Sequence, residues 1–451
     1  MAVGAVLSLV LLLACAAPAS AAIKRVTVRQ GPLAVDPYGV RFTSPKTRAI
    51  RAPGLDGYLV SMHTRVVDRR GRPMPVRRLM LHHIVYKNTS RSDPVCGGKQ
   101  SFYGTGEENE TLRFPPGYGY RVRRRDRWIT GWMLMNHRGR RQVAYIEYTA
   151  RIETRKRLRP VIPYWARVTG CRGARDPIFN VPGGGAPGST HTETAGWTVP
   201  RSGRIVAAGS HVHGGSKEIL LTQPTCEDRV LLTSRPLYGR AGHPYYNVLP
   251  VLHEPGPFAT SWITTAAGIP VRRGERLRVV SLYDGERPHM RVMGIWHVYL
   301  APGPPPANAC PPMPTDVRNK LPAKPGRLEA PKVTVPLTGL DGRGRARPIR
   351  RPPGPLMRAG RRATVRVGED TFSVRNLSIA RGGRVTWRFR DGRGSHDVTL
   401  ASGPFGPVGF ASRWDLKSRR YSRRFDIPGT YRLYCTLHPI DMTQVLEVRP
   451  E

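Results

Sequence analysis

The chain consists of short runs in which apolar and polar residues alternate, separated at short intervals by Gly and Pro. Clear examples span residues 143–152, 277–283, 294–300, 385–389 and 431–435. Long amphipathic helical patterns are absent, and glycine (48) and proline (44) are both abundant. Because alternation puts successive side chains on opposite faces of a strand, the pattern predicts an all-β chain made of sandwiches or barrels.

One change of composition marks a clear boundary in this pattern. Residues 302–362 are rich in Pro, Gly and Arg, which cannot bury a core and predict an extended linker. At 451 residues the chain is too long for a single core. We therefore predict a leader at 1–22, sandwiches at 23–170 and 171–301, the linker, and a third sandwich at 363–451. No internal repeat at a fixed period accompanies this division.

The sequence of residues 1–22 predicts that the leader is a secretory signal peptide. Residues 5–14 are apolar apart from Ser8, a run too short to span a membrane, and Ala19-Ser-Ala21 offers small residues suited to signal peptidase. No later segment is apolar enough to be transmembrane. We expect an exported, extracytoplasmic protein, either secreted or associated with the cell surface, with a lipid anchor at Cys15 as an alternative.

The six cysteines divide by context. Cys15 leaves with the leader, and Cys435 belongs to a metal motif described below. An even number remains, and an oxidising compartment favours two disulfides with three possible connectivities. The four disulfide candidates are Cys96, Cys171, Cys226 and Cys310.

The chain is strongly basic, with a formal net charge of +42. The basic residues are spread along the whole chain, and no basic helix, zinc finger or RNA-binding motif accompanies them. Because the protein is also expected to leave the cytoplasm, we exclude nucleic acid as a partner. The charge predicts a solvated surface, and the functional alternative is adhesion to anionic cell-surface polymers.

Four potential metal ligands lie close together near the C-terminus. His396 follows the strand predicted at 385–389, Cys435 ends the next alternating run, and His438 and Met442 lie in the loop after it. Type 1 copper needs one thiolate and two imidazoles in a trigonal set with a weak axial thioether. Zinc accepts similar ligands, but Met442 favours copper. The alternative is that Cys435 is only a buried apolar residue.

The order His, Cys, His, Met resembles the cupredoxin family, which includes plastocyanin and amicyanin, over residues 363–451. The resemblance implies a Greek-key β-sandwich, one type 1 copper and one-electron transfer. It also implies that His438 is the ligand at the solvent edge. A redox partner protein or a small-molecule reductant would exchange the electron. The three-residue spacing from His438 to Met442 departs from the familiar members, so Met442 is the least regular ligand.

Histidine pairs occur twice in the preceding part of the chain. His82 and His83 are adjacent in a strand-like segment, where neighbouring side chains point to opposite faces, so binding one metal with both requires a twist or a bulge. His211 and His213 alternate and therefore share one strand face. His137 lies between the two pairs in the sequence.

These pairs resemble the copper type II, ascorbate-dependent monooxygenases, which hold two coppers in two jelly-roll domains. The resemblance implies a first body copper at His82, His83 and His137. It implies a second at His211, His213 and Met290, with Met293 as the alternative to Met290. Together with the type 1 site, it implies up to three coppers in the chain.

The same region is similar to the stress-up-regulated nodulin family and its bacterial relatives. Shared phrases are Gly117-Tyr-Gly-Tyr120, Met135-Asn-His137 and His253-Glu-Pro-Gly256. In the last phrase, the pair His253-Glu254 is a candidate for orienting a metal ligand from behind. No role is assigned to the remaining histidines of the region: His243, His253, His289 and His297.

Three positions depart from the peptide-hydroxylating enzymes. Gly209 replaces the Arg that holds the substrate carboxylate, and Gly294 and Val292 replace the Tyr and Asn of the same pocket. A peptidylglycine substrate is therefore not expected, and whether the body is an enzyme stays open. Two functions follow: a secreted copper redox protein that feeds electrons to a monooxygenase-like body, or a non-catalytic copper-binding, storage or stress-related envelope protein.

Overall fold

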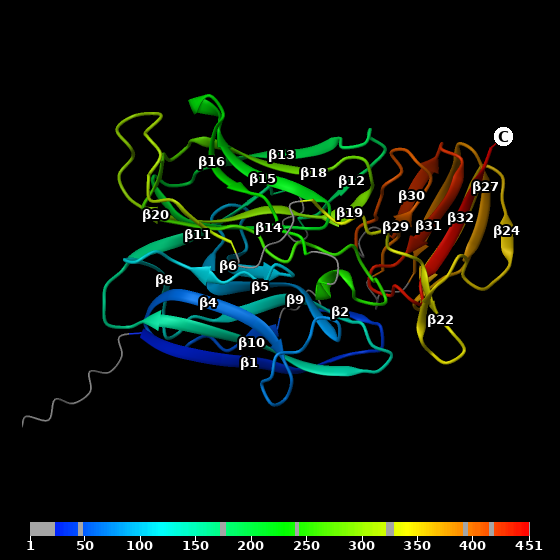
Figure 1. Cartoon of the computed structure of the whole chain (residues 1–451), viewed down its shortest axis with the longest axis horizontal. Helices are drawn as coiled ribbons and strands as arrows, with labels where there is room; N and C mark the ends of the chain where they lie inside the picture. The colour runs from blue at the N-terminus through cyan, green and yellow to red at the C-terminus, as the bar shows by residue number, and fades with distance from the viewer. Residues whose placement is uncertain are drawn as a thin grey trace, which may run out of the picture.

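The computed structural model describes residues 23–43, 48–171, 177–239, 243–321, 329–390, 396–414 and 419–450. In these ranges the chain is built from β-strands, and the only helical elements are two short 3₁₀ turns, η1 (Pro224–Cys226) and η2 (Pro244–Tyr246). The predicted all-β class is therefore confirmed. Figure 1 shows a larger body next to a smaller C-terminal sandwich in orange and red. No helix in the described part of the chain is long and apolar enough to span a membrane.

The first sandwich has a jelly-roll strand order. One sheet runs β1 (Ile23–Val35), β10 (Gln142–Glu153), β4 (Gly57–Val67) and β8 (Tyr118–Val122), with β7 (Leu112–Arg113) also on β4. The other runs β2 (Val40–Phe42), β9 (Trp128–Asn136), β5 (Leu79–Ser92) and β6 (Lys99–Gly106), with β3 (Arg48–Ile50) also on β9. The two short strands β3 and β7 are left out when the eight main strands are numbered along the chain. The first sheet then has the order 1-8-3-6 and the second the order 2-7-4-5, which is the order of a jelly roll.

The second sandwich repeats this order. One sheet runs β11 (Arg159–Arg167), β20 (Gly294–Pro302), β14 (Gly203–Val212) and β17 (Trp262–Val271). The other runs β13 (Thr190–Thr198), β18 (Arg276–Asp284), β15 (Ser216–Gln223) and β16 (Arg229–Ser234). A small ladder of β12 (Phe179–Val181) and β19 (His289–Val292) lies outside these sheets. The predicted pair of jelly rolls is thus present, although the sequence shows no periodic repeat.

The two jelly rolls are joined into one body by a shared sheet. Strands β8 and β11 pair in parallel, which makes one ten-stranded sheet from both sandwiches. In Figure 1 this sheet bends round, so that β14 and β20 lie over β5 and β6. Backbone carbonyls of the first sandwich accept hydrogen bonds from Trp262 (to Arg113, 2.9 Å) and Tyr299 (to Phe102, 2.9 Å). These two bonds give buried polar side chains of the second sandwich partners in the first.

The C-terminal sandwich has two sheets of mixed direction. One runs β24 (Leu356–Arg358), β27 (Asn376–Ala380), β32 (Thr443–Arg449), β31 (Gly429–Tyr434) and β29 (Thr399–Ser402). The other runs β26 (Thr371–Phe372), β25 (Arg362–Gly368), β28 (Gly383–Phe389) and β30 (Arg420–Phe425). Trp387 and Leu446 are fully buried between the sheets.

The described parts of the Pro-rich segment, 302–321 and 329–362, contain short strands that pair with other strands of the protein. Its strand β21 (Arg318–Lys320) extends the ten-stranded sheet at β17, and β22 (Thr338–Leu340) forms a hairpin with β23 (Ala346–Pro348). Leu337 is buried against Tyr434 and Val445 of the C-terminal sandwich. The sequence underestimated this order because short edge strands tolerate Pro and carry little hydrophobic signal.

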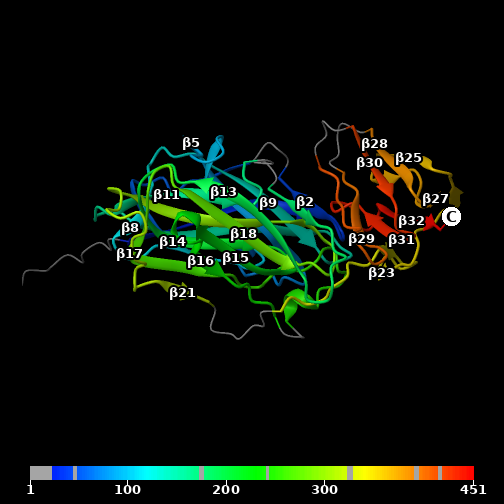
Figure 2. The same ribbon diagram turned by 90° about the horizontal axis from the view of Figure 1, so that it is seen from above.

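The C-terminal sandwich packs directly on the body, as Figure 2 also shows from above. Its core is continuous with Met133 and Met135 of β9, and Phe42 of β2 stacks on Trp414 with ring centroids 5.8 Å apart. The extended linker is therefore not the sole connection between the C-terminal sandwich and the body, because the two also share a packed interface.

Two disulfides tie distant parts of the body. Cys96 bonds to Cys171, and Cys226 bonds to Cys310, which anchors the start of the Pro-rich segment. All four candidate cysteines are thus paired, and one of the three possible connectivities is selected.

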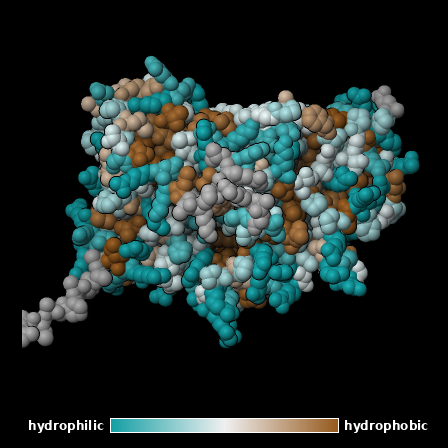
Figure 3. All heavy atoms as spheres, in the orientation of Figure 1, coloured by the Kyte–Doolittle hydropathy of each residue, from teal (hydrophilic) through white to brown (hydrophobic). Residues whose placement is uncertain are grey.

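Hydrophilic side chains are scattered among apolar ones across the face shown in Figure 3.

Candidate metal centres

The C-terminal ligand loop is closed by its own backbone. It leaves β31 after Tyr434 and enters β32 at Thr443. The Cys435 amide donates to Met442 O (3.0 Å), the His438 amide to Cys435 O (3.2 Å), and the Met442 amide to His438 O (3.0 Å). These bonds fix the positions of three candidate ligands relative to the strand ends.

Three of the four predicted ligands meet at one point. His396 Nδ1 lies 3.2 Å from His438 Nδ1, and Cys435 Sγ lies 3.7 Å from His438 Nδ1. The Nε2 atoms of both imidazoles instead face the Asp370 carboxylate, at 3.8 Å and 3.2 Å. Two imidazole nitrogens and one sulfur thus face inward, which is the donor set that type 1 copper requires.

The site is buried except at one edge. The side chain of His396 is 1% exposed, whereas that of His438 is 29% exposed. Burial raises the pKa of the Cys435 thiol well above its usual range, and the Asp397 carboxylate adds to the effect. Met442 is fully buried in the same core. Its role as the axial ligand stays a prediction.

Asp397 connects the two ligand-bearing segments. Its Oδ1 accepts from the Thr436 amide (2.7 Å), and its Oδ2 accepts from Thr436 Oγ1 (2.6 Å) and Trp414 Nε1 (2.8 Å). Because Asp397 follows His396 and Thr436 follows Cys435, these bonds hold the two ligands in a fixed relation.

The adjacent histidines of the body lie at a bulge. The pairing of β5 with β9 shifts register between Leu81 and His83, which is the irregularity that the His82–His83 pair was expected to need. The ring centroids of His82 and His83 are 5.3 Å apart.

The second histidine pair lies at the end of β14. The Nε2 atoms of His211 and His213 are 3.3 Å apart, and His211 Nδ1 donates to Glu108 Oε1 (2.9 Å). Burial opposes protonation of His211, but Glu108 outweighs it and raises the pKa of His211. Burial lowers the pKa of His213 well below its usual value.

The two histidine pairs converge instead of forming separate sites. The ring centroids of His82 and His213 are 5.2 Å apart, and those of His82 and His253 are 4.8 Å apart. Glu107 lies between the latter two, where its Oε1 accepts from His82 Nδ1 (2.8 Å) and His253 Nε2 (2.5 Å). The structure therefore adds Glu107, Glu108 and His253 to the candidate site.

Sequence reasoning gave these three residues no ligand role. Glu107 and His253 are 146 positions apart, so no local spacing connects them. The available signal was an adjacent pair of acidic residues in a chain with only 31 acidic against 73 basic residues. Both Glu107 and Glu108 are buried, which is uncommon for carboxylates without partners.

His137 is buried close to the same cluster. Its Nδ1 donates to Pro250 O (3.1 Å), while its Nε2 is buried without a hydrogen-bond partner in the described structure. Burial, together with nearby His253, lowers the pKa of His137 to about 4. A neutral imidazole with Nε2 free is suited to metal binding.

Met290 faces the C-terminal sandwich. A Cβ added at Gly409 would lie 2.6 Å from the Met290 Cε and 2.7 Å from the backbone oxygen of Val181. Because the Val181 oxygen is backbone, a larger residue at Gly409 would require a shift there. Both Met290 and Met293 line a cavity of about 110 Å³ between the two parts of the molecule. His82 and His213 reach this cavity from the body, and Tyr434 reaches it from the C-terminal sandwich.

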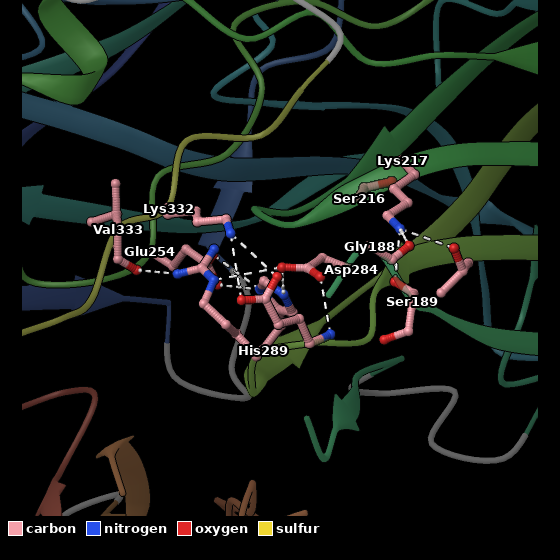
Figure 4. A network of polar contacts seen from close by, with 12 residues as sticks. Gly188, Ser189, Ser216, Lys217, Glu254, Asp284, His289, Lys332 and Val333 are labelled. Atoms are coloured by element: carbon pink, nitrogen blue, oxygen red, sulfur yellow. Dashed lines mark hydrogen bonds and ion pairs between the residues drawn. The ribbon is translucent and has the colours of Figure 1, made fainter. Parts of the chain in front are cut away.

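A network of charged residues supports the loop that carries His253. His289 donates from Nδ1 to Glu254 Oε2 (2.8 Å) and has Asp284 Oδ2 3.5 Å from its Nε2. Burial opposes the charge of His289, but Glu254 and Asp284 raise its pKa to about 9. Figure 4 shows His289, Glu254 and Asp284 gathered with Lys332 of the Pro-rich segment. Glu254 thus connects the loop that carries His253 to His289. The sequence had predicted no role for His289.

No family model and no curated protein matches this chain. Solved structures of amicyanin are similar to part of it. A methionine-to-glutamine mutant in the Cu(I) form is 26% identical over 20% of this chain and 83% of that chain, with a TM-score of 0.18. A proline-to-glycine mutant in the reduced Cu(I) form is 29% identical over 19% of this chain and 80% of that chain, also with a TM-score of 0.18.

Proposed function

We propose that the chain is an extracytoplasmic copper redox protein whose C-terminal sandwich transfers single electrons. The observation that carries this proposal is the meeting of His396 Nδ1, His438 Nδ1 and Cys435 Sγ within 4.8 Å of one another. Met442 is the proposed axial ligand. Copper bound in this set supplies a one-electron couple.

The residues around the set support this role by resisting rearrangement. The loop hydrogen bonds at Cys435 and His438 and the bridge from Asp397 to Thr436 hold the ligands in one geometry. A site that moves little between oxidation states exchanges electrons with a small barrier. The partly exposed His438 is the proposed contact for a redox partner protein or a small-molecule reductant.

The body is the proposed destination of the electrons. Its two jelly rolls have the same strand order. His82, His83 and His213 face one cavity that Tyr434, the residue before Cys435, also lines. The resemblance to copper monooxygenases motivates an oxygen-activating role. Gly209 at the position of the substrate-binding Arg is the observation that favours the rival function, a non-catalytic copper-binding protein.

The first experiment measures the visible spectrum and copper content of the copper-loaded protein. An intense blue band is expected in the wild type and is expected to vanish in Cys435→Ser, while His191→Asn, a substitution on β13 of the body, keeps it. Absence of the band in the loaded wild type would contradict the type 1 site.

A second measurement separates the two roles of the body. Reductant-dependent oxygen consumption that depends on His213 supports the monooxygenase-like function. Copper binding by the body without oxygen consumption supports the binding protein.

A further inference from the structure

We propose that His82, Glu107 and His253 form a metal site of two imidazoles and one carboxylate, which takes a divalent first-row transition ion. The site deepens the metal-binding role proposed for the body, and it does not depend on the type 1 centre. One nitrogen of each imidazole and one carboxylate oxygen lie within 4.8 Å of one another. This set differs from both copper sites implied by the sequence, because it shares only His82 with the first and no residue with the second.

The three residues come from separate elements that converge between the jelly rolls. His82 lies on β5, Glu107 in the turn after β6, and His253 in the loop between η2 and β17. Both carboxylate oxygens of Glu107 are fixed, because Oε2 accepts from the Gly256 amide (2.8 Å) while Oε1 faces the imidazoles. The carboxylate is therefore oriented before any ion binds.

The charge of this carboxylate calls for a cation. The side chain of Glu107 is only 4% exposed, and its ion pairs among the described residues are with His82 and His253 alone. A buried carboxylate is costly unless it is paired or coordinates a metal. A divalent ion binds each imidazole at the nitrogen that points at the carboxylate. A neutral ring then carries its proton on the other nitrogen, and a protonated ring releases one proton to solvent.

Buried ring nitrogens without a hydrogen-bond partner give a second indication that an ion binds here. The Nδ1 atoms of His83 and His253 are buried and have no hydrogen-bond partner in the described residues. The ring centroids of His83 and His213 lie 5.3 Å and 5.2 Å from that of His82, so both histidines are available as additional ligands. The adjoining cavity leaves room for a small molecule at the open positions of an ion.

The donor set determines the class of ion. Carboxylate oxygen is a hard ligand, and two histidines with one carboxylate form the set that leaves open positions on non-haem Fe(II). Cu(I) instead prefers thiolate, thioether and imidazole. The site is therefore expected to hold Fe(II), Zn(II) or Cu(II), and to bind Cu(I) weakly.

The test uses the full-length chain with Cys435→Ser and His213→Asn, which remove the type 1 site and the His-x-His pair. The chelator-stripped protein is titrated with Zn(II) in a calorimeter. Glu107→Gln is expected to weaken binding by at least about tenfold. Glu147→Gln is the matched control, because the Glu147 side chain is equally buried but pairs with Arg29 and Arg65, away from the site. It is expected to leave Zn(II) affinity within about twofold, below the tenfold scale of a lost supporting residue.

Several outcomes overturn the proposal. They are no Zn(II) binding in the parent variant, an unchanged affinity in Glu107→Gln, or an equal loss in both glutamine variants. If Glu107→Gln does not fold, as judged by thermal unfolding, His253→Gln decides, and an unchanged affinity there overturns the site. Absence of the blue band in the copper-loaded wild type would contradict the type 1 proposal, but it would not change the interpretation of the Zn(II) titrations.

Discussion

The Arg291 guanidinium reaches from the body to Asp397, with Nη1 3.5 Å from Oδ2. Arg291 belongs to β19, and its guanidinium also lies 3.7 Å from the ring centroid of Trp414 and donates to Ser412 O (2.9 Å). Asp397 in turn holds Thr436 beside Cys435. One residue of the body is therefore connected to both ligand-bearing segments of the C-terminal site.

Substituting Arg291→Ala is expected to loosen the interface. The substitution leaves the fully buried Asp397 without its cation, which costs about 3 kcal/mol of unfolding free energy. It also removes a positive charge near the copper, which should lower the reduction potential. Denaturant unfolding followed by the blue absorbance, with a redox titration, measures both. Lys332→Ala is the control, since its ion pair with Glu286 is exposed and should cost less than about 1 kcal/mol.

Substituting Asp397→Asn is expected to raise the reduction potential. Removal of a buried negative charge destabilises the more positive Cu(II) state, and the new amide N–H faces the donors of Trp414 or Thr436. A redox titration and the electron paramagnetic resonance spectrum report the change. Thr399→Val removes one hydrogen bond to Asp397 but no charge, so a similar rise in that variant would refute the electrostatic explanation.

Removing the Cys226–Cys310 bond is expected to destabilise the second jelly roll. The bond closes a loop with a sequence separation of 84, and the loss of a constraint of that length costs about 4 kcal/mol in the chain-entropy account. Cys226→Ser with Cys310→Ser, measured by denaturant unfolding, tests this. Limited proteolysis should then cut first near β21, and an intact β21 would count against an anchoring role.

The stability of the body should fall as pH rises from about 5 to about 8, because of Glu110. Burial raises the pKa of Glu110 to about 8 and the Glu108 charge adds to this, although Arg113 opposes it. Between its usual value and the raised pKa, the folded state binds more protons than the unfolded state, so stability is lost as pH rises. Glu110→Gln should flatten this dependence in unfolding measured at several pH values. An unchanged slope would exclude Glu110 as the cause.

The grouping of the C-terminal candidate ligands was largely predictable because three of the four residues are local in the sequence. Cys435, His438 and Met442 share one loop, so their order and spacing in the sequence carry most of the geometry. The bulge at His82 and His83 was likewise predictable, since two adjacent strand residues cannot otherwise face one site.

The rest of the body site depends on contacts that no local pattern encodes. Glu107 meets His253 only because the two jelly rolls stack, and Arg291 meets Asp397 only because the C-terminal sandwich docks. The repeated strand order was predictable only through the resemblance to enzymes with two jelly rolls, because topology constrains the alternation of strands but not the identity of their residues.

The parallel pairing of β8 with β11 has a mechanical consequence. Backbone hydrogen bonds join the two jelly rolls into one sheet, so the described residues at β8 and β11 resist the hinge motion that closes many two-domain enzymes around their substrates. The span between His82 and His213 is consequently set by a stiff frame, and it changes through rotation of side chains. A molecule that reaches both histidines must be small enough to enter the cavity that they line.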